Sequence, residues 1–122
     1  MGIKGNRLPQ DIKILELIKR RRRQLVVHSI IYYRLNDSII TDKQFDTWAR
    51  ELVKLQKEYP DLSKEVELYE DFQDWDGTTG FNLKSLMDPR MTAIASQLLS
   101  TSKHLTDYPF IIRDKKKLII KF

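Results

Sequence analysis

The sequence has no cysteine and little glycine or proline, with four of each in 122 residues. The absence of cysteine excludes disulfides and thiolate metal sites, and it favours an intracellular location. No apolar run approaches the roughly 20 residues that span a bilayer, and the first ten residues lack the apolar stretch of a signal peptide. We therefore expect a cytoplasmic protein that folds as one domain, since 122 residues suffice for a core.

Signatures of metal binding and of common enzyme classes are also missing. The two histidines, His28 and His104, lie far apart and have no neighbours at ligand spacing, so no metal site is predicted. The chain has no glycine-rich phosphate loop, no nucleophile elbow and no paired histidine and carboxylate. We therefore expect no enzyme of these classes.

Charge is distributed unevenly, although the net charge is only +5. Residues 1–34 carry nine Lys or Arg against two Asp or Glu, residues 35–88 carry six against thirteen, and residues 89–122 carry seven against two. This layout indicates either nucleic-acid contact at the ends of the chain or ends that fold back onto the acidic middle. We favour the second interpretation.

Apolar residues recur at helical spacing over much of the chain, which predicts a mainly α fold of about four helices. Residues 1–10 form a flexible leader rich in glycine and proline, and the uninterrupted residues 10–35 are expected to form one long helix. Four consecutive arginines wrap around this helix and should hold their turn away from a core. The same four are the candidate phosphate contacts of a nucleic-acid interface: Arg20, Arg21, Arg22 and Arg23.

Capping signals indicate where the next helices begin and end. Thr41, followed by Gln44, is typical of a capping box at a helix start, and Pro60 is expected to end that helix. Asp88-Pro89 predicts the start of a last helix that continues to about Ser102. Between them a shorter helix is expected, and its inward residues should be Leu62, Val66, Tyr69 and Phe72.

The last residues of the chain have a different pattern. Residues 108–122 hold two β-branched runs around a charged turn, which predicts a C-terminal β-hairpin. The expected organisation is a single domain over residues 11–122. It comprises a helix–turn–helix core at 11–62, a helical and loop extension at 63–103, and the hairpin.

The residue types best suited to ligand binding lie at the junction of the first two helices. Tyr32 and Tyr33 end the first helix, and a polar turn leads into the second. Asp42 and Asp46 share one face of the second helix, with Phe45 beside them. Two aromatic planes with carboxylates between them suit a flat heteroaromatic ring, and a cationic ring would gain about 1–2 kcal/mol from cation–π attraction. The helix start also favours a phosphate.

A purely structural role explains the same residues. Tyr33 and Phe45 suit a core, and Asp42 and Asp46 suit a helix N-terminus, where carboxylates interact favourably with the helix dipole. From spacing alone, this structural interpretation is the stronger of the two.

A resemblance to a known family favours the binding interpretation. The segment resembles, without a gap, the N-terminal Ia domain of NAD-dependent bacterial DNA ligases. That family's pattern is Tyr-(His/Tyr), an eight-residue spacer, Asp-x-x-Tyr-Asp, and then Glu-Leu-x-x-Leu-Glu and Pro-Glu-Leu. Domain Ia is a small helical unit that closes over NAD and binds its nicotinamide mononucleotide (NMN) half. The matching residues here are Tyr32-Tyr33, Asp42-Lys43-Gln44-Phe45-Asp46, Glu51-Leu52, Leu55 and Tyr59-Pro60-Asp61-Leu62.

The resemblance implies a role for each matching residue. Tyr32 corresponds to the tyrosine that stacks on nicotinamide, and Tyr33 corresponds to the adjacent histidine or tyrosine. Asp42 and Asp46 correspond to the two acids that contact NMN, and Phe45 corresponds to a second stacking tyrosine without its hydroxyl. The implied ligand is NMN, NAD or a related nucleotide, held as a ligand and not as a redox cofactor.

The resemblance does not extend to catalysis. Ligases adenylate a lysine in a Lys-x-Asp-Gly motif, whereas this chain has Asp74-Trp75-Asp76-Gly77, with a carboxylate in place of the nucleophilic amine. Including the loop at residues 76–81, the chain is most similar to small stand-alone ligase-Ia-like proteins encoded by phages of Gram-positive bacteria. We therefore expect a non-catalytic phage-type accessory protein in the host cytoplasm.

Two alternative functions stay open. The acidic segment after the second helix is most simply a solvated face, but it also suits an anti-defence protein that inhibits a host defence or DNA-processing enzyme. The third candidate is a nucleic-acid accessory role through Arg20–Arg23 and residues 115–117. No membrane partner is expected. The residues proposed for the host-protein interface are Glu70, Asp71, Asp74 and Trp75.

Overall fold

The computed structural model describes residues 8–80 and 82–106. Within these residues the protein is mainly helical, as the sequence predicts, and it contains no strand. The predicted hairpin at 108–122 lies outside the described residues. The described elements are α1 (Pro9–Tyr33), α2 (Asp42–Glu58), α3 (Pro60–Lys64), α4 (Tyr69–Phe72), the 3₁₀ helix η2 (Lys84–Met87) and α5 (Pro89–Thr106).

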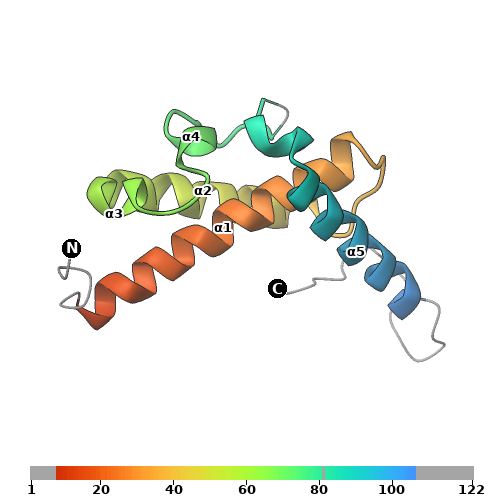
Figure 1. Cartoon of the computed structure of the whole chain (residues 1–122), viewed down its shortest axis with the longest axis horizontal. Coiled ribbons are helices and arrows are strands. Elements are labelled where there is room, and N and C mark those ends of the chain that lie inside the picture. The colour runs from red at the N-terminus through yellow and green to blue at the C-terminus, as the bar shows by residue number, and fades with distance from the viewer. Residues whose placement is uncertain (1–7, 81, 107–122) are drawn as a thin grey trace.

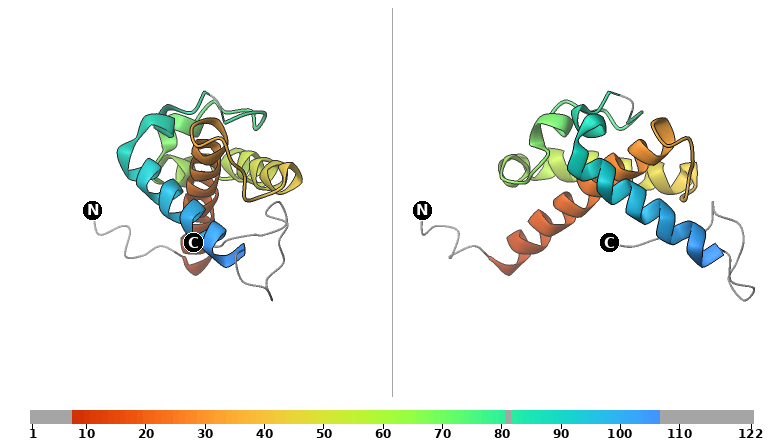
Figure 2. Two further views of the ribbon diagram at one scale, coloured as in Figure 1. Left: turned by 90° about the vertical axis from the view of Figure 1, so that its right-hand side faces the viewer. Right: turned by 45° about the vertical axis from the view of Figure 1, so that its right-hand side comes forward.

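Helix α1 is the central element of the fold, and α2, α3, η2 and α5 all pack against it (Figure 1). The single long helix predicted from the sequence is confirmed. The helix begins at Pro9, whereas the predicted leader ended at residue 10. Pro9 takes the first helical position because its fixed φ suits that position. Its second half is buried almost all round, over residues 24–31, whereas its first turns extend beyond the other helices (Figure 2).

Helix α2 returns antiparallel to α1 after a short turn (Figure 1). Asn36 provides the reversal with a left-handed φ of 52°, a conformation that asparagine tolerates better than most residues. The predicted N-cap is confirmed, since the Thr41 hydroxyl accepts a 3.0 Å hydrogen bond from the backbone N–H of Gln44. The apolar face of α2 then buries Trp48 and Leu52 against α1.

The prediction of one short helix after Pro60 is wrong in one respect, because the chain forms two helices there. Leu68 has a φ of 67° and therefore divides the segment into α3 and α4. Two of the predicted inward residues, Val66 and Phe72, are nevertheless buried. The left-handed conformation is costly for a residue with a Cβ, so tertiary packing and not local preference must stabilise this break.

Helix α5 crosses the C-terminal half of α1 (Figures 1 and 2). Its predicted start is confirmed, because the Asp88 carboxylate accepts hydrogen bonds from the N–H groups of Arg90 (2.7 Å) and Met91 (3.4 Å). Met91, Ala95 and the two leucines of the next turn face the core. Among the described residues, none of the helices combines the length and the apolar composition that a membrane crossing requires.

The sequence suggested that the four consecutive arginines hold their turn of α1 away from the core, and this prediction is wrong. Arg22 is fully buried, with 0% of its surface exposed. Its Nη1 donates to the backbone oxygens of Ser63 (3.1 Å), Val66 (2.9 Å) and Glu67 (3.1 Å). Its Nη2 donates to the Gln56 side chain at 2.8 Å and to the Ser63 hydroxyl at 2.5 Å. One guanidinium therefore pairs the converging carbonyl groups at the end of α3.

The neighbouring arginines connect α1 to the acidic middle of the chain. Arg21 forms an ion pair with Glu51, and Arg23 forms one with Glu67. The hydrogen bond from Arg23 lowers the pKa of the Glu67 carboxyl below its usual range. For this part of the chain, the prediction that a basic end folds back onto acidic residues is confirmed.

Candidate functional site

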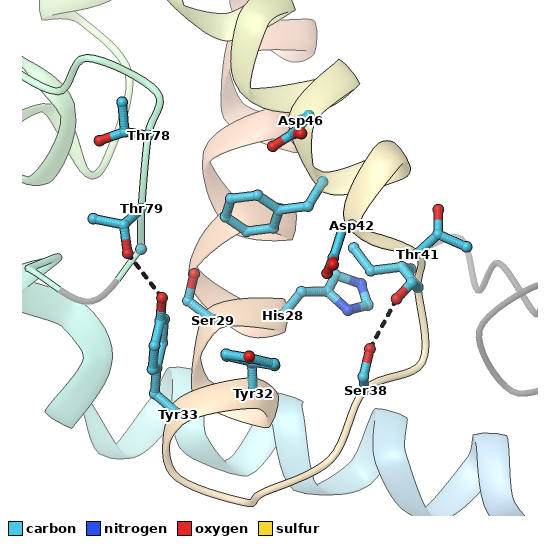
Figure 3. A pocket seen from close by; sticks show the side chains of 13 residues that line it. His28, Ser29, Tyr32, Tyr33, Ser38, Thr41, Asp42, Asp46, Thr78 and Thr79 are labelled. Atoms are coloured by element: carbon cyan, nitrogen blue, oxygen red, sulfur yellow. Dashed lines mark hydrogen bonds between the residues drawn. The ribbon is translucent and has the colours of Figure 1, made fainter.

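A pocket of about 340 Å³ lies where the end of α1, the start of α2 and the loop after α4 meet (Figure 3). The five residues that the sequence suggested as a site all line this pocket. In the sequence they form two groups, Tyr32-Tyr33 and Asp42–Asp46, which are separated by eight residues. The complete lining comprises His28, Ser29, Tyr32, Tyr33, Ser38, Ile40, Thr41, Asp42, Phe45, Asp46, Thr78, Thr79 and Gly80.

The tyrosines present their rings to solvent and do not belong to the core. Tyr32 is 57% exposed and Tyr33 is 38% exposed. Their rings meet edge to face with centroids 4.9 Å apart. The Tyr33 hydroxyl forms a 2.8 Å hydrogen bond with the Thr79 hydroxyl, which fixes that ring (Figure 3). The structural interpretation from the sequence, in which Tyr33 is a core residue, is therefore wrong for this position.

Phe45 has an intermediate role. It is partly buried and packs against the core cluster, while it also lines the pocket. The structural and ligand-facing interpretations of this residue are therefore compatible. The phenyl ring of Phe45 contributes an apolar wall to the pocket, because it carries no polar atom.

Two carboxylates stand at the α2 side of the pocket. Asp42 and Asp46 are exposed and lie four residues apart, so both project from one face of the first helical turns (Figure 3). The N–H of Gln44 is already bonded to Thr41, which removes one of the free donors at this helix start. The wall therefore presents acceptors for hydroxyl, amide or cationic groups.

The third wall is the segment Thr78–Gly80, which the sequence indicated only as a loop. The loop turns at Gly77, whose φ of 86° favours glycine. The Trp75 indole N–H then donates a 2.6 Å hydrogen bond to the Thr79 carbonyl. Gly80 lies directly on Ser29, since a Cβ there would come within 1.8 Å of the Ser29 hydroxyl oxygen. The glycines of the sequence Gly77-Thr78-Thr79-Gly80 indicate that the backbone approaches a neighbouring element closely, but they do not indicate which residue it approaches.

His28 lies at the base of the pocket and was not predicted as a site residue. It is 4% exposed, and its ring centroid lies 5.6 Å from that of Trp48. Burial lowers the pKa of His28 to about 4. The imidazole is therefore neutral near pH 7 and adds no charge to the pocket.

Acidification is expected to destabilise the protein through His28. The folded pKa is about 4, against an unfolded value of about 6.5, so the unfolded chain binds a proton first as the pH falls below 6.5. The contribution of the neutral His28 to the free energy of unfolding is intact above pH 6.5 and is lost as the pH falls towards 4. At pH 5 we expect the free energy of unfolding to be about 2 kcal/mol lower than at pH 7.5.

Urea denaturation of the wild type and of His28→Gln at both pH values checks this expectation. Because the carboxylates are common to the two proteins, their contribution cancels in the comparison, and the variant should lose less stability than the wild type on acidification. Equal losses in the two proteins would contradict the assignment to His28.

The residues suggested for other interfaces lie outside this pocket. Asp71 accepts hydrogen bonds from the N–H (2.7 Å) and the hydroxyl (3.0 Å) of Ser85, and Trp75 packs edge to face on Phe72 with centroids 5.0 Å apart. Both side chains thus have structural roles within the fold. Glu70 and Asp74 are exposed, and a host-protein interface at these four residues stays a prediction.

Comparison with known proteins identifies the segment that builds most of this pocket. Residues 12–65 match the family described as "DNA ligase-like, N-terminal NAD+-binding domain". The chain is 36% identical over 61 residues to the DNA ligase of Thermotoga neapolitana, a match that covers 50% of this chain and 8% of that ligase. It is 39% identical over 56 residues to the DNA ligase of Pseudothermotoga lettingae, covering 46% of this chain and 8% of the ligase.

A third relative agrees with these two. The DNA ligase of Leptospira biflexa is 45% identical over 42 residues, which are 34% of this chain and 6% of that ligase. No solved structure matches the chain significantly. The matched segments thus cover less than a tenth of the length of these ligases. Residues 12–65, less than half of the chain, form a ligase Ia-like domain that is similar to the N-terminal NAD+-binding domains of DNA ligases.

Proposed function

We propose that this chain is a non-catalytic module that binds NMN, NAD or a related nucleotide in the pocket between α1, α2 and the segment Thr78–Gly80. The observation that carries the proposal is the joint placement of the five motif residues. They come from two helices and line one pocket, within the segment that matches the NAD+-binding family.

The chemistry of the pocket suits a nicotinamide ring and its ribose. The exposed faces of Tyr32 and Tyr33 offer stacking surfaces, and an aromatic ring attracts a cationic pyridinium more strongly than a neutral one. Asp42 and Asp46 accept hydrogen bonds from ribose hydroxyls or from the carboxamide N–H. A small-molecule site commonly combines such apolar walls with a few well-placed polar groups.

Two features lower the expected affinity. Phe45 replaces the tyrosine of the family pattern, so a ligand keeps the aromatic wall and loses one hydroxyl partner. In the family, domain Ia closes over an NAD that another domain also holds, and the pocket alone lacks those further contacts. We therefore expect dissociation constants in the micromolar to millimolar range, about −8 to −4 kcal/mol.

The non-catalytic part of the proposal is supported by the sequence Asp74-Trp75-Asp76-Gly77, which resembles the Lys-x-Asp-Gly motif of ligases but lacks its lysine. Asp74 is an exposed carboxylate and has no amine to attack a phosphate. A phage-type accessory protein of this kind would sense or sequester a nucleotide that the host uses.

Calorimetric titration with NMN and with NAD tests the binding proposal. We expect measurable binding of at least one ligand, and a loss of at least about tenfold in affinity for Tyr32→Ala and for Asp46→Ala, which corresponds to about 1.4 kcal/mol. Asp74→Ala is the matched control, because it removes an exposed carboxylate outside the pocket. No binding of either ligand at millimolar concentration would overturn the proposal.

A further inference from the structure

The charges around the pocket have one sign. Asp42 and Asp46 are the acidic residues of its lining, and no lysine or arginine occurs among the lining residues that the structure describes. His28 is neutral near pH 7 because burial lowers its pKa to about 4. A phosphate attached to a bound ligand would therefore lie near two carboxylates without a cationic side chain from the lining.

The start of α2 gives little compensation for a phosphate. A helix N-terminus ordinarily attracts anions through its free N–H groups and its dipole. Here the Thr41 hydroxyl occupies the Gln44 N–H at 3.0 Å, and Asp42 places a carboxylate in the first turn. One N–H donor at this helix start is thus already occupied, and a carboxylate of the chain itself lies in its first turn.

The other walls favour a planar cation. Tyr32 and Tyr33 expose ring surface, and Phe45 adds a third ring to the lining. A volume of about 340 Å³ lies at the lower end of the roughly 300–1,000 Å³ found for small-molecule sites. Such a pocket suits one aromatic ring with its sugar better than a dinucleotide.

A buried polar group also stands in the wall of the pocket. Ser29 is 1% exposed, and its hydroxyl oxygen has no hydrogen-bond partner among the described residues. Its hydroxyl points toward the pocket beside Thr79 (Figure 3). The protein covers this hydroxyl oxygen completely, so Ser29 supports the wall at Gly80 and adds no charge and no contact for a ligand.

We propose that this site selects positively charged N-ribosyl pyridiniums without a phosphate, of which nicotinamide riboside is the simplest, over the corresponding mononucleotide and dinucleotide. This inference rests on the proposed function, because it assumes that the pocket binds nicotinamide compounds. It differs from the family expectation in the role of the phosphate, which this pocket repels.

Titration at low ionic strength with nicotinamide riboside, NMN, NAD and uncharged dihydronicotinamide riboside tests the inference. We expect the riboside to bind about fivefold to tenfold more tightly than NMN, and also more tightly than the uncharged riboside. The preference over NMN should shrink as added salt screens the carboxylates.

Asp42→Asn and Asp46→Asn keep the shape of the two side chains and remove their charge. In the double variant, whose fold is checked by circular dichroism, the riboside and NMN should bind within about twofold of each other. Ser29→Ala serves as the control, since it changes a wall residue without removing a charge and should leave the ratio of the two affinities unchanged.

The possible outcomes separate the two proposals. If NMN or NAD binds as tightly as the riboside in the wild-type protein, the selectivity is refuted while nucleotide binding stands. If none of the four compounds binds at millimolar concentration, both proposals fail.

Discussion

Arg22→Ala is expected to lower the free energy of unfolding by about 4 kcal/mol, the largest single effect among the substitutions considered. The change removes a fully buried guanidinium whose Nη1 pairs three backbone carbonyls, those of Ser63, Val66 and Glu67. Breaking a buried ionic or hydrogen-bonded network from one side costs about 3–5 kcal/mol, because the remaining polar groups stay buried without partners. Urea denaturation followed by circular dichroism measures the loss.

The adjacent Arg20→Ala is the matched control. Arg20 is exposed, so removing it should change stability by no more than about 0.5 kcal/mol. Arg22→Lys should recover only part of the loss, since an ammonium lacks the planar fork that reaches Gln56 and Ser63 together. A loss below about 1 kcal/mol for Arg22→Ala would show that the converging carbonyls find other donors.

Gly80→Ala is expected to destabilise the protein by about 3 kcal/mol and to abolish ligand binding. The added Cβ would stand 1.8 Å from the Ser29 hydroxyl oxygen and 2.7 Å from its Cβ, so the segment Thr78–Gly80 must move away from α1. Forcing extra volume into a packed site costs about 1–3 kcal/mol. Thermal unfolding and calorimetric titration with a nicotinamide ligand measure the two effects.

A second substitution tests the cause of this effect. Ser29→Gly removes the two Ser29 atoms that the new methyl group would meet, so the double variant should recover binding. It should also recover the free energy of unfolding, apart from about 1 kcal/mol that a glycine within a helix costs. Gly77→Ala is the control, because its cost comes from a φ of 86° and Ser29→Gly should not relieve it. Absence of rescue in the double variant would argue against direct packing of Gly80 on Ser29.

Local signals in the sequence were sufficient for the three long helices α1, α2 and α5. Thr41 and Asp88 mark helix starts through hydrogen bonds that span only two or three residues, and Pro9 suits the first helical position. The five predicted site residues all line one pocket, since their spacing on two helices joined by a short turn brings their side chains together. Their role in binding remains the proposal tested above.

Long-range contacts explain what the sequence did not predict. Burial of Arg22 depends on carbonyl groups more than 40 residues away, and the wall at Gly80 depends on Ser29, about 50 residues away. Nothing in the local sequence marks Leu68 for a left-handed conformation, because leucine rarely adopts it. His28 has no neighbours at ligand spacing in the sequence, and only the packing of α1 against α2 places it beneath the pocket.

The two tyrosines of the pocket differ in the conformational entropy that a ligand must remove. Tyr33 is held on one side by its hydrogen bond to Thr79 and on the other by the Tyr32 ring, so its orientation is set before any ligand arrives. Tyr32 is 57% exposed and has more rotational freedom to lose. Ordering such a side chain costs about 0.5–1.5 kcal/mol. In the proposed site Tyr33 is therefore a pre-organised platform, whereas stacking of a ligand on Tyr32 would cost more conformational entropy.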